Sequence, residues 1–220
     1  MNLGERLLRV VPALRRSLDQ IPVHAAAWEA ANARSLQGAG PLWVVLGDST
    51  AQAIGVARGI EHGYVGRVRR LLEERDGVPW RVVNLSRSGA VVADVLSVQL
   101  PAMATLPTPD LVSCVVGGND LRRTPLPQLL DDLEALVAAL PAGAVLGNLP
   151  KGLREAKAVQ ANTLLTRLAA TRGVRVADLW TRTGPPWRGK YADGLHPNEE
   201  GLAEWVAALG DALGLPAERG

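Results

Sequence analysis

The chain has 220 residues, of which 47% are apolar and 21% are charged, values typical of a globular domain of ordinary size. These values exclude disordered, collagen-like and coiled-coil proteins, and no uncharged apolar run approaches the ~18 residues that a membrane-spanning helix needs. The net charge of +2 is too small for the electrostatic footprint of a nucleic-acid-binding protein, so we expect no nucleic-acid partner.

The sequence carries no disulfide or metal-site signature. Cys114 is the single cysteine, and its place in an apolar run predicts a buried, reduced thiol. His24, His62 and His196 are too far apart in sequence for a metal-ligand motif, and we expect no metal and no other cofactor. The N-terminus, MNLGERLLRVVPALRR, lacks the apolar core of a secretory signal and predicts a cytoplasmic location.

Residues 1–40 have a pattern of their own. In the first half, apolar residues recur at steps of three and four, which is the period of a helix, and an alanine-rich second helical stretch covers 24–36. Pro12 and Pro22 are expected to interrupt or bound these helices. We interpret the segment as an amphipathic helical extension packed on the domain or on a second subunit. The alternative is a basic helix that associates with a membrane surface.

From residue 41 to residue 220, short apolar runs alternate with longer helical stretches, which indicates one domain. The predicted strands are 42–46, 81–85, 111–116, 144–149 and 174–177, and the predicted helices are 64–75, 90–100, 127–140, 154–171 and 199–213. Apolar strands that alternate with helices predict a parallel sheet covered on both faces. The expected fold class is α/β: a three-layer α/β/α sandwich with a five-stranded parallel, flavodoxin-like sheet, preceded by an N-terminal helical extension.

Small and polar residues collect where the predicted strands end. GDST (47–50) follows the first strand, SRSG (86–89) the second and GGND (117–120) the third, while DGLHPN (193–198) precedes the last helix. In doubly wound sheets, ligands bind outside the carboxyl ends of the strands. We therefore expect the functional site to form from these four segments.

These stretches, in this order, resemble the sequence blocks of the SGNH (GDSL-type) hydrolases, a family of esterases, lipases, thioesterases and carbohydrate deacylases. GDST resembles the first block, the turn at Gly89 the second, GGND the third and DGLHPN the fifth. The resemblance runs from about Leu42 to Trp205 and implies an SGNH hydrolase domain over 41–220. Thr50 replaces the commoner leucine of the GDSL motif, and Asp48 is implied to be a structural partner that holds the loop.

The residues of these segments include a nucleophile, a base and an acid that can orient the base. Ser49 is expected to open a helix whose N-terminal N–H groups favour an oxyanion. His196 is the natural general base because imidazole titrates near neutral pH, and Asp193, three residues earlier, can orient its ring. The backbone N–H groups of Ser49 and Gly89 and the side-chain amide of Asn119 would form the oxyanion hole. Each residue also has a plain role as a helix cap or turn, but all of these at once would require several coincidences.

The substrate pocket is less defined by the sequence. Trp187, Arg188 and Tyr191 lead into the loop of Asp193, and Arg87 lies just before the Gly89 turn. Stacking and positive charge at these positions would favour an anionic or sugar-like group; alternatively, the tryptophan anchors the loop and the cations are solvated. No long apolar insertion suggests a lipase lid, so we expect a short or medium acyl chain.

We predict a serine hydrolase that cleaves carboxylic O-acyl or thioester bonds of a small-molecule acyl ester through an acyl-enzyme on Ser49. An acyltransferase would use the same acyl-enzyme, and the oligomeric state stays open. A different class is a non-catalytic, flavodoxin-like module that binds a nucleotide or phosphate, and a third is an inactive scaffold that interacts through residues 1–37. Against the binding module, the sequence lacks GxGxxG after the first strand and GxxxxGK[ST].

Overall fold

A five-stranded sheet forms the centre of the computed structural model, which describes residues 3–152 and 154–218. The strands are β1 (Leu42–Gly47), β2 (Arg81–Asn84), β3 (Leu111–Val115), β4 (Val145–Gly147) and β5 (Arg175–Ala177). They lie in the order β2-β1-β3-β4-β5 with every pairing parallel, which is the flavodoxin-like order. The predicted fold class is confirmed, and β4 is shorter than the sequence pattern suggested.

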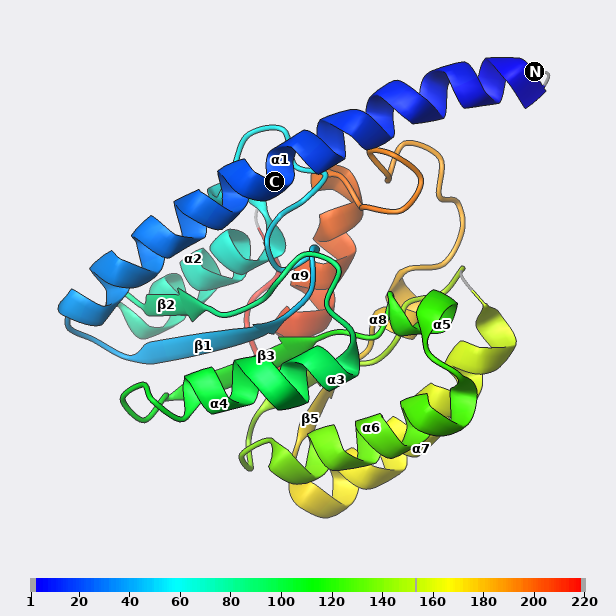
Figure 1. Cartoon of the computed structure of the whole chain (residues 1–220). Coiled ribbons are helices and arrows are strands. Elements are labelled where there is room, and N and C mark those ends of the chain that lie inside the picture. Colours follow the sequence, from blue (N-terminus) through cyan, green and yellow to red (C-terminus); the bar gives the residue numbers. More distant parts are fainter. Residues whose placement is uncertain (1–2, 153, 219–220) are drawn as a thin grey trace.

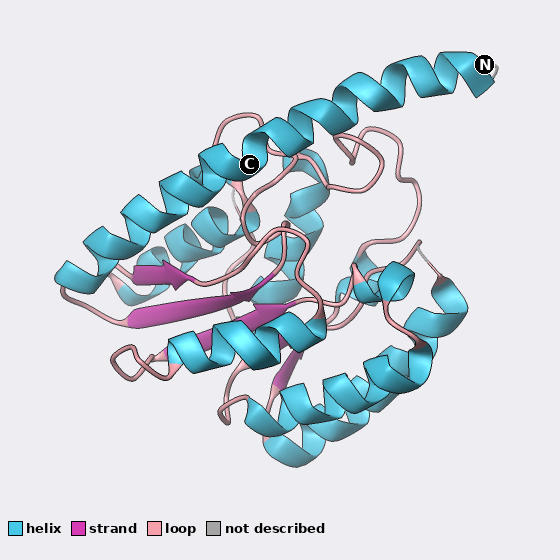
Figure 2. Cartoon of the chain, in the orientation of Figure 1, coloured by secondary structure: helices cyan, strands magenta, loops and turns pink. Residues whose placement is uncertain are grey.

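Helices cover both faces of this sheet, as Figure 1 and Figure 2 show. On one side lie α1 (Leu3–Gln37), α2 (Tyr64–Asp76) and α9 (Glu199–Leu213), and on the other α3 (Val92–Asp94), α4 (Leu100–Met103), α6 (Leu126–Ala139) and α7 (Glu155–Arg172). A π-helical turn, η2 (Val95–Gln99), joins α3 to α4. The short helices η1 (Ile60–His62), α5 (Asp120–Arg123) and α8 (Leu179–Arg182) were not predicted.

The side chains of β1 show how the sheet is buried on both faces. Trp43 and Val45 belong to the core cluster that includes α2 and α9, whereas Val44 and Leu46 belong to the cluster that includes α6 and α7. Successive residues of a strand point to opposite faces, so a strand covered on both sides must be apolar throughout. Cys114 of β3 is buried in the second cluster as the free thiol that was predicted, and burial raises its pKa.

The N-terminal segment differs from the prediction in its continuity. A single helix, α1, spans Leu3–Gln37 with Pro12 and Pro22 inside it, so the expectation that these prolines interrupt the helix was wrong. An internal proline removes a backbone hydrogen bond and costs about 3 kcal/mol. On either side of Pro22, Ser17 and His24 are buried against the rest of the chain, so the helix is packed along this part of its length. Nothing in the structure explains Pro12.

The face of α1 that packs on the chain does not include Leu14 or Leu18. Ser17, His24 and Trp28 are buried, whereas Leu14 and Leu18 are 39% and 51% exposed. None of the helices in the described ranges combines the length and apolar character needed to cross a bilayer. The structure thus shows α1 packed on its own chain, and the division at residue 40 stays a prediction.

One contact of α1 lies at the edge of the sheet. The side-chain Oδ1 of Asn32 accepts the backbone N–H of Asn84, and Asn32 Nδ2 donates to the Asn84 carbonyl, both at 2.8 Å. Asn84 is the last residue of β2, the edge strand. Its own side chain donates to the Ala51 carbonyl at 2.9 Å. A single residue of β2 therefore links α1 to the loop that follows β1.

The end of β1 is fixed by a close backbone approach. Gly47 has a φ of +152°, and an added Cβ would lie 2.4 Å from the carbonyl oxygen of Val115 on β3. The buried side chain of Gln99 accepts the Gly47 N–H and donates to the Gly47 carbonyl, both at 2.8 Å. The strand end is thus held directly before Asp48 and Ser49.

Replacing Gly47 with alanine is expected to lower the free energy of unfolding by about 3 kcal/mol or more, because backbone strain and a clash with Val115 add together. Gly77 is the matched control: its φ is +69°, but nothing lies within 4 Å of an added Cβ. Gly77→Ala should cost only about 1–2 kcal/mol. Urea unfolding followed by tryptophan fluorescence compares the free energies of unfolding of the two variants. Equal losses would show that the contact with Val115 adds nothing to the cost of backbone strain.

Candidate active site

A pocket of about 490 Å³ lies over the carboxyl ends of the strands. Ser49 lines it from the loop after β1, Asn119 from the loop after β3, and His196 from the loop before α9. The order of the strands reverses between β1 and β3, which is where doubly wound folds bind ligands. Three of the predicted site residues, separated widely in sequence, therefore share one pocket.

Ser49 lies in a run of turns. Residues 49–55 form turns, Ala53 has a φ of +65° and Gly55 a φ of +97°, and these left-handed residues end the helical course after about one turn. The next α-helix, α2, begins only at Tyr64. The expectation that Ser49 opens a helix was therefore wrong, and any help to an oxyanion comes from individual N–H groups rather than from a long helix dipole.

The loop before α9 holds Asp193 against His196. A backbone bridge between Tyr191 and Pro197 closes this loop. Asp193 Oδ2 lies 2.7 Å from His196 Nδ1, and Asp193 Oδ1 accepts the backbone N–H groups of Leu195 at 2.9 Å and His196 at 2.7 Å. The bond at Nδ1 leaves the other ring nitrogen, Nε2, for the pocket that His196 lines.

The Asp193 side chain has no exposure to water. Burial by itself would raise its pKa, but hydrogen bonds from the ring and backbone of His196, from the Ser17 side chain and from the Leu195 backbone outweigh burial. The net effect holds the pKa of Asp193 well below its usual value. The carboxylate therefore stays ionised, so that it can orient the imidazole and stabilise its protonated form.

The turn at Gly89 is fixed from the side of β3. Asn119 Nδ2 donates to the Ala90 carbonyl at 3.0 Å, and Arg123 Nη1 donates to the Gly89 carbonyl at 2.9 Å. Gly89 has a φ of +81° and, unlike Asn119, is not among the residues that line the pocket. An amide nitrogen carries two hydrogens, so Asn119 keeps a second donor for a bound oxygen.

Gln52 fixes the same turn from the side of β1. Its Nε2 donates to the Ser86 carbonyl at 2.9 Å, and its Oε1 accepts the N–H of Ser88 at 3.0 Å and the Ser88 hydroxyl at 2.6 Å. Ser88 directly precedes Gly89, so the loops after β1 and β2 are joined through one buried side chain. The sequence analysis did not identify Gln52, because a glutamine in a turn carries no catalytic signature.

The outer wall of the pocket contains most of the predicted substrate-binding residues. Trp187, Arg188 and Tyr191 line it, whereas Arg87 is exposed and lies outside the lining. Trp187 also donates from Nε1 to the Thr183 carbonyl at 3.0 Å, so it anchors its loop as well as facing the pocket.

A second part of this wall was not singled out from the sequence. Pro150, Lys151 and Gly152, in the loop after β4, line the pocket beside Trp187. Their position could have indicated the site, because this loop follows the carboxyl end of a strand, as the other site segments do. It carries no residue with an obvious catalytic role, and the sequence pattern therefore gave it no weight.

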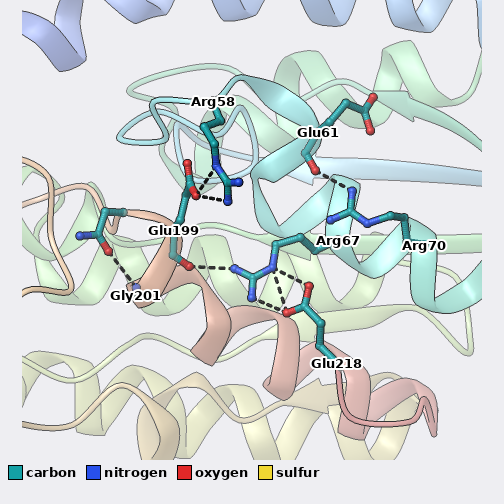
Figure 3. Close-up of polar contacts among 8 residues, drawn as sticks. Arg58, Glu61, Arg67, Arg70, Glu199, Gly201 and Glu218 are labelled. Carbon is teal, nitrogen blue, oxygen red and sulfur yellow. Dashed lines mark hydrogen bonds and ion pairs between the residues drawn. The ribbon is translucent and has the colours of Figure 1, made fainter. Parts of the chain in front are cut away.

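The chain that follows His196 is tied to α2 (Figure 3). Arg67 of α2 donates from Nη1 to the backbone carbonyl of Glu199, the first residue of α9, at 2.8 Å. The same guanidinium pairs with Glu218 near the C-terminus, and Arg58 donates from Nε to the Glu199 carboxylate at 2.8 Å. These contacts restrict the start of α9 and hence the loop that carries the imidazole.

The three histidines have separate environments. His24 Nδ1 lies 3.1 Å from the Gln52 carbonyl, and burial lowers the pKa of His24 although backbone hydrogen bonds oppose the shift. His62 belongs to η1, and only His196 lines the pocket. Among the side chains that the structure describes, no group of three His, Cys, Asp or Glu residues is placed to hold a metal ion.

The architecture and the pocket define a class: a doubly wound α/β enzyme with a serine and a histidine in one crevice at the carboxyl edge of its sheet. The GDSL-like Lipase/Acylhydrolase family matches residues 45–203. The chain belongs to this family, and it is a carboxylic ester hydrolase of the GDSL type. The family predicted from the sequence is confirmed.

Several solved structures have a similar fold. LAE5, an α/β hydrolase enzyme from the metagenome of Lake Arreo in Spain, is 23% identical with a TM-score of 0.65, over 80% of this chain and 96% of that one. Axe2, an acetylxylan esterase from Geobacillus stearothermophilus, is 22% identical with a TM-score of 0.62, over 83% and 98%. TesA is 25% identical with a TM-score of 0.64, over 78% and 97%. No curated protein matches the chain in sequence.

Asp48, next to Ser49, is a buried acid with an unusual pKa. Its Oδ1 accepts the Thr50 N–H at 3.0 Å, which fits the role of holding the loop. Burial raises the pKa of Asp48 from 3.8 to about 6, although the hydrogen bonds of Thr50 and the charge of His196 act in the opposite direction. Ionisation of Asp48 is therefore less favourable in the folded protein than in the unfolded chain.

The contribution of Asp48 to the stability of the protein should consequently fall as the pH rises through this range. Between pH 4 and 6 the unfolded chain loses the Asp48 proton while the folded protein keeps it, so the free energy of unfolding falls by at most about 3 kcal/mol. Asp48→Asn cannot titrate and retains an acceptor for Thr50. Urea unfolding at several pH values should show its advantage over the wild type growing from pH 4 to 7, and a constant difference would contradict the assignment.

Proposed function

We propose that this protein hydrolyses O-acyl or thioester bonds of small substrates through an acyl-enzyme on Ser49. The observation that carries the proposal is the 2.7 Å contact between Asp193 and His196, in a loop whose histidine shares a pocket with that serine. Family membership gives ester hydrolysis as the reaction class. The proposal adds the residues that perform it and the kind of substrate.

The reaction follows from the order of these groups. His196 Nε2 takes the proton of the Ser49 hydroxyl while its oxygen attacks the acyl carbon, and Asp193 stabilises the imidazolium that forms. The imidazolium then returns the proton to the leaving alcohol or thiol, and the acyl group remains on Ser49. A water molecule that gives its proton to His196 attacks the acyl-enzyme, and the acid is released as the proton returns to the serine.

The oxyanion of each tetrahedral intermediate is received by neutral donors. These are the backbone N–H groups of Ser49 and Gly89 and the side-chain amide of Asn119. The fixed positions of the Gly89 turn and of the amide support this role, because donors held before the reaction cost no reorganisation during it. A neutral amide stabilises the oxyanion without adding a positive charge that would lower the basicity of His196.

The pocket favours a short or medium acyl chain. Its volume of about 490 Å³ suits a small ligand, and its inner wall is apolar, with contributions from Val116, Leu121 and Trp205. The acetylxylan esterase among the similar structures supports a small acyl group. Passing the acyl group to an alcohol would use the same acyl-enzyme, and hydrolysis is the function we propose.

The family match over 45–203 supports a hydrolase domain that covers residues 41–220. Residues 1–40 then form an N-terminal helical extension to it.

Replacing Ser49 with alanine is expected to lower kcat on p-nitrophenyl esters at least about a thousandfold, since the variant cannot form the acyl-enzyme. A series of esters from acetate to palmitate measures this loss and the preferred chain length. A fluorophosphonate probe should label the wild type and fail to label the variant.

Ser97→Ala, on the exposed face of η2, is the matched control and should keep full activity and labelling. Labelling of Ser49→Ala, or hydrolysis at more than a few per cent of the wild-type rate, would contradict the assignment of the nucleophile.

Two cations indicate the charge of the preferred substrate. Lys151 and Arg188 both line the pocket, and Lys151 Nζ lies 5.5 Å from the centre of the Trp180 ring. In the described part of the chain, neither cation pairs with a carboxylate. Lys190, by contrast, pairs with Glu204 of α9. We therefore propose a substrate with an anionic group on its leaving alcohol.

Arg188→Gln is expected to lower kcat/KM for 4-acetoxybenzoate about fivefold while changing it little for the neutral methyl ester of the same compound. Arg87→Gln makes the same change outside the pocket and should leave the ratio of the two substrates unaltered. The discrimination should weaken as salt is added. An equal effect of both substitutions, or an equal loss on both substrates, would exclude recognition of an anion by Arg188.

A further inference from the structure

The inner face of α1 reaches the catalytic loops. Figure 1 shows α1 running from the β2 edge of the sheet to the loops that precede α9. Ser17, Gln20 and His24 follow one another at steps of three and four, so they share one face of the helix. All three make hydrogen bonds to segments that surround the pocket. The family match begins only at residue 45, so none of them belongs to the family motifs.

Ser17 completes the hydrogen bonding of the buried Asp193 carboxylate. Two backbone N–H groups occupy Oδ1, and the His196 ring occupies one side of Oδ2. A carboxylate has about four acceptor positions, and the hydroxyl of Ser17, which is 2% exposed, supplies another donor. Because the Asp193 side chain is completely buried, bulk water has no access to take the place of that hydroxyl.

Gln20 holds the turn on which His196 rests. Its Oε1 accepts the Gly55 N–H at 2.8 Å and its Nε2 donates to the Val56 carbonyl at 3.1 Å. A Cβ added to Gly55 would lie 3.0 Å from the Cβ of His196 and 2.6 Å from the Pro197 carbonyl. This backbone therefore packs directly against the histidine loop, residues 191–197. α1 thus contacts the acid of the pair through Ser17 and supports the base through the Gly55 turn.

We propose that α1 is part of the catalytic apparatus: Ser17 positions Asp193, and Gln20 positions the Gly55 turn behind His196. The inference rests on the proposed function, in which these two residues are the acid and base partners of Ser49. Neither α1 side chain touches the substrate. Their effect is to fix the carboxylate and the imidazole in one relative orientation, so that Nε2 stays aimed at the pocket.

Two substitutions at Ser17 test the proposal. Ser17→Ala removes the hydroxyl, and Ser17→Cys replaces it with a weak donor of similar shape, which separates hydrogen bonding from packing. Both should lower kcat about tenfold with KM within about twofold of the wild-type value. Without this donor, the carboxylate holds the imidazole proton more strongly, so the acid limb of the kcat/KM profile should move to higher pH.

Ser35→Ala makes the same change on α1 far from the pocket and is the control for helix stability. Gln20→Ala should also lower kcat, whereas Asn32→Ala, which also removes two hydrogen bonds between α1 and the sheet, should keep kcat within about twofold.

The outcomes separate the two proposals. If the Ser17 variants match Ser35→Ala in kcat and in pH profile, the positioning role is overturned. The same holds if their thermal midpoints fall and the acid limb does not move, because α1 would then only stabilise the fold. If Ser49→Ala remains active, the proposed function itself fails, whatever the behaviour of Ser17.

Discussion

In a parallel sheet, the loops that follow the strands all leave from the carboxyl ends of the strands, on the same side of the sheet. The site of this enzyme depends on that constraint. The loops after β1, β3 and β4 line the pocket, and the loop after β2 is tied to those of β1 and β3. At the carboxyl ends of the strands the regular backbone pairing of the sheet stops, and the backbone N–H and carbonyl groups near the core still need hydrogen-bond partners. Side-chain amides fill that need. Gln99 pairs with both backbone groups of Gly47, and Gln52 joins the first two loops.

These amides explain how a site made of turns can be rigid. A turn lacks the regular backbone hydrogen bonds of a helix or sheet, so hydrogen bonds from other segments determine its shape. The Gly89 turn receives bonds from Gln52 on one side and from Asn119 and Arg123 on the other. The histidine loop is closed by its own backbone bridge and is followed at once by the anchored start of α9. The Gly89 turn, the Asn119 amide and the loop of His196 are therefore held before any substrate arrives.

The fold could be predicted from the sequence because it depends on patterns along short segments. Apolar strands separated by helical stretches predicted the sheet, and the strand-end motifs placed Ser49, Asn119 and His196 at one edge, where the structure has them. The contiguous DGLHPN motif also brought Asp193 next to its histidine, since three residues of one loop span little distance. The errors arose where distant contacts decide the outcome. Packing along α1 maintains the helix through Pro22, and the left-handed Ala53 ends the turn after Ser49.

The residues that the sequence did not reveal have the same explanation. Gln52, Ser17 and Gln20 act through hydrogen bonds to segments far away in the chain, and a glutamine or serine on a helix or turn has many ordinary uses. The loop 148–152 became part of the pocket only through its place beside the histidine loop. Local sequence can identify a reactive group and a partner in the same loop, but side chains that reach them from distant parts of the chain become visible only when the chain is folded.

The contact of Asn32 with β2 affects whether the edge strand of this enzyme can pair with a strand of another molecule. The outer side of an edge strand offers unpaired backbone groups that can be extended by a strand from another molecule. At Asn84 both of these groups are occupied by one side-chain amide, which imitates the pairing of a neighbouring strand. A chain shortened to the segment that matches the family would leave that donor and acceptor open. At this position the N-terminal helix thus occupies the backbone groups with which a strand of another molecule would pair, through a contact separate from the hydrogen bonds of Gln20 and His24.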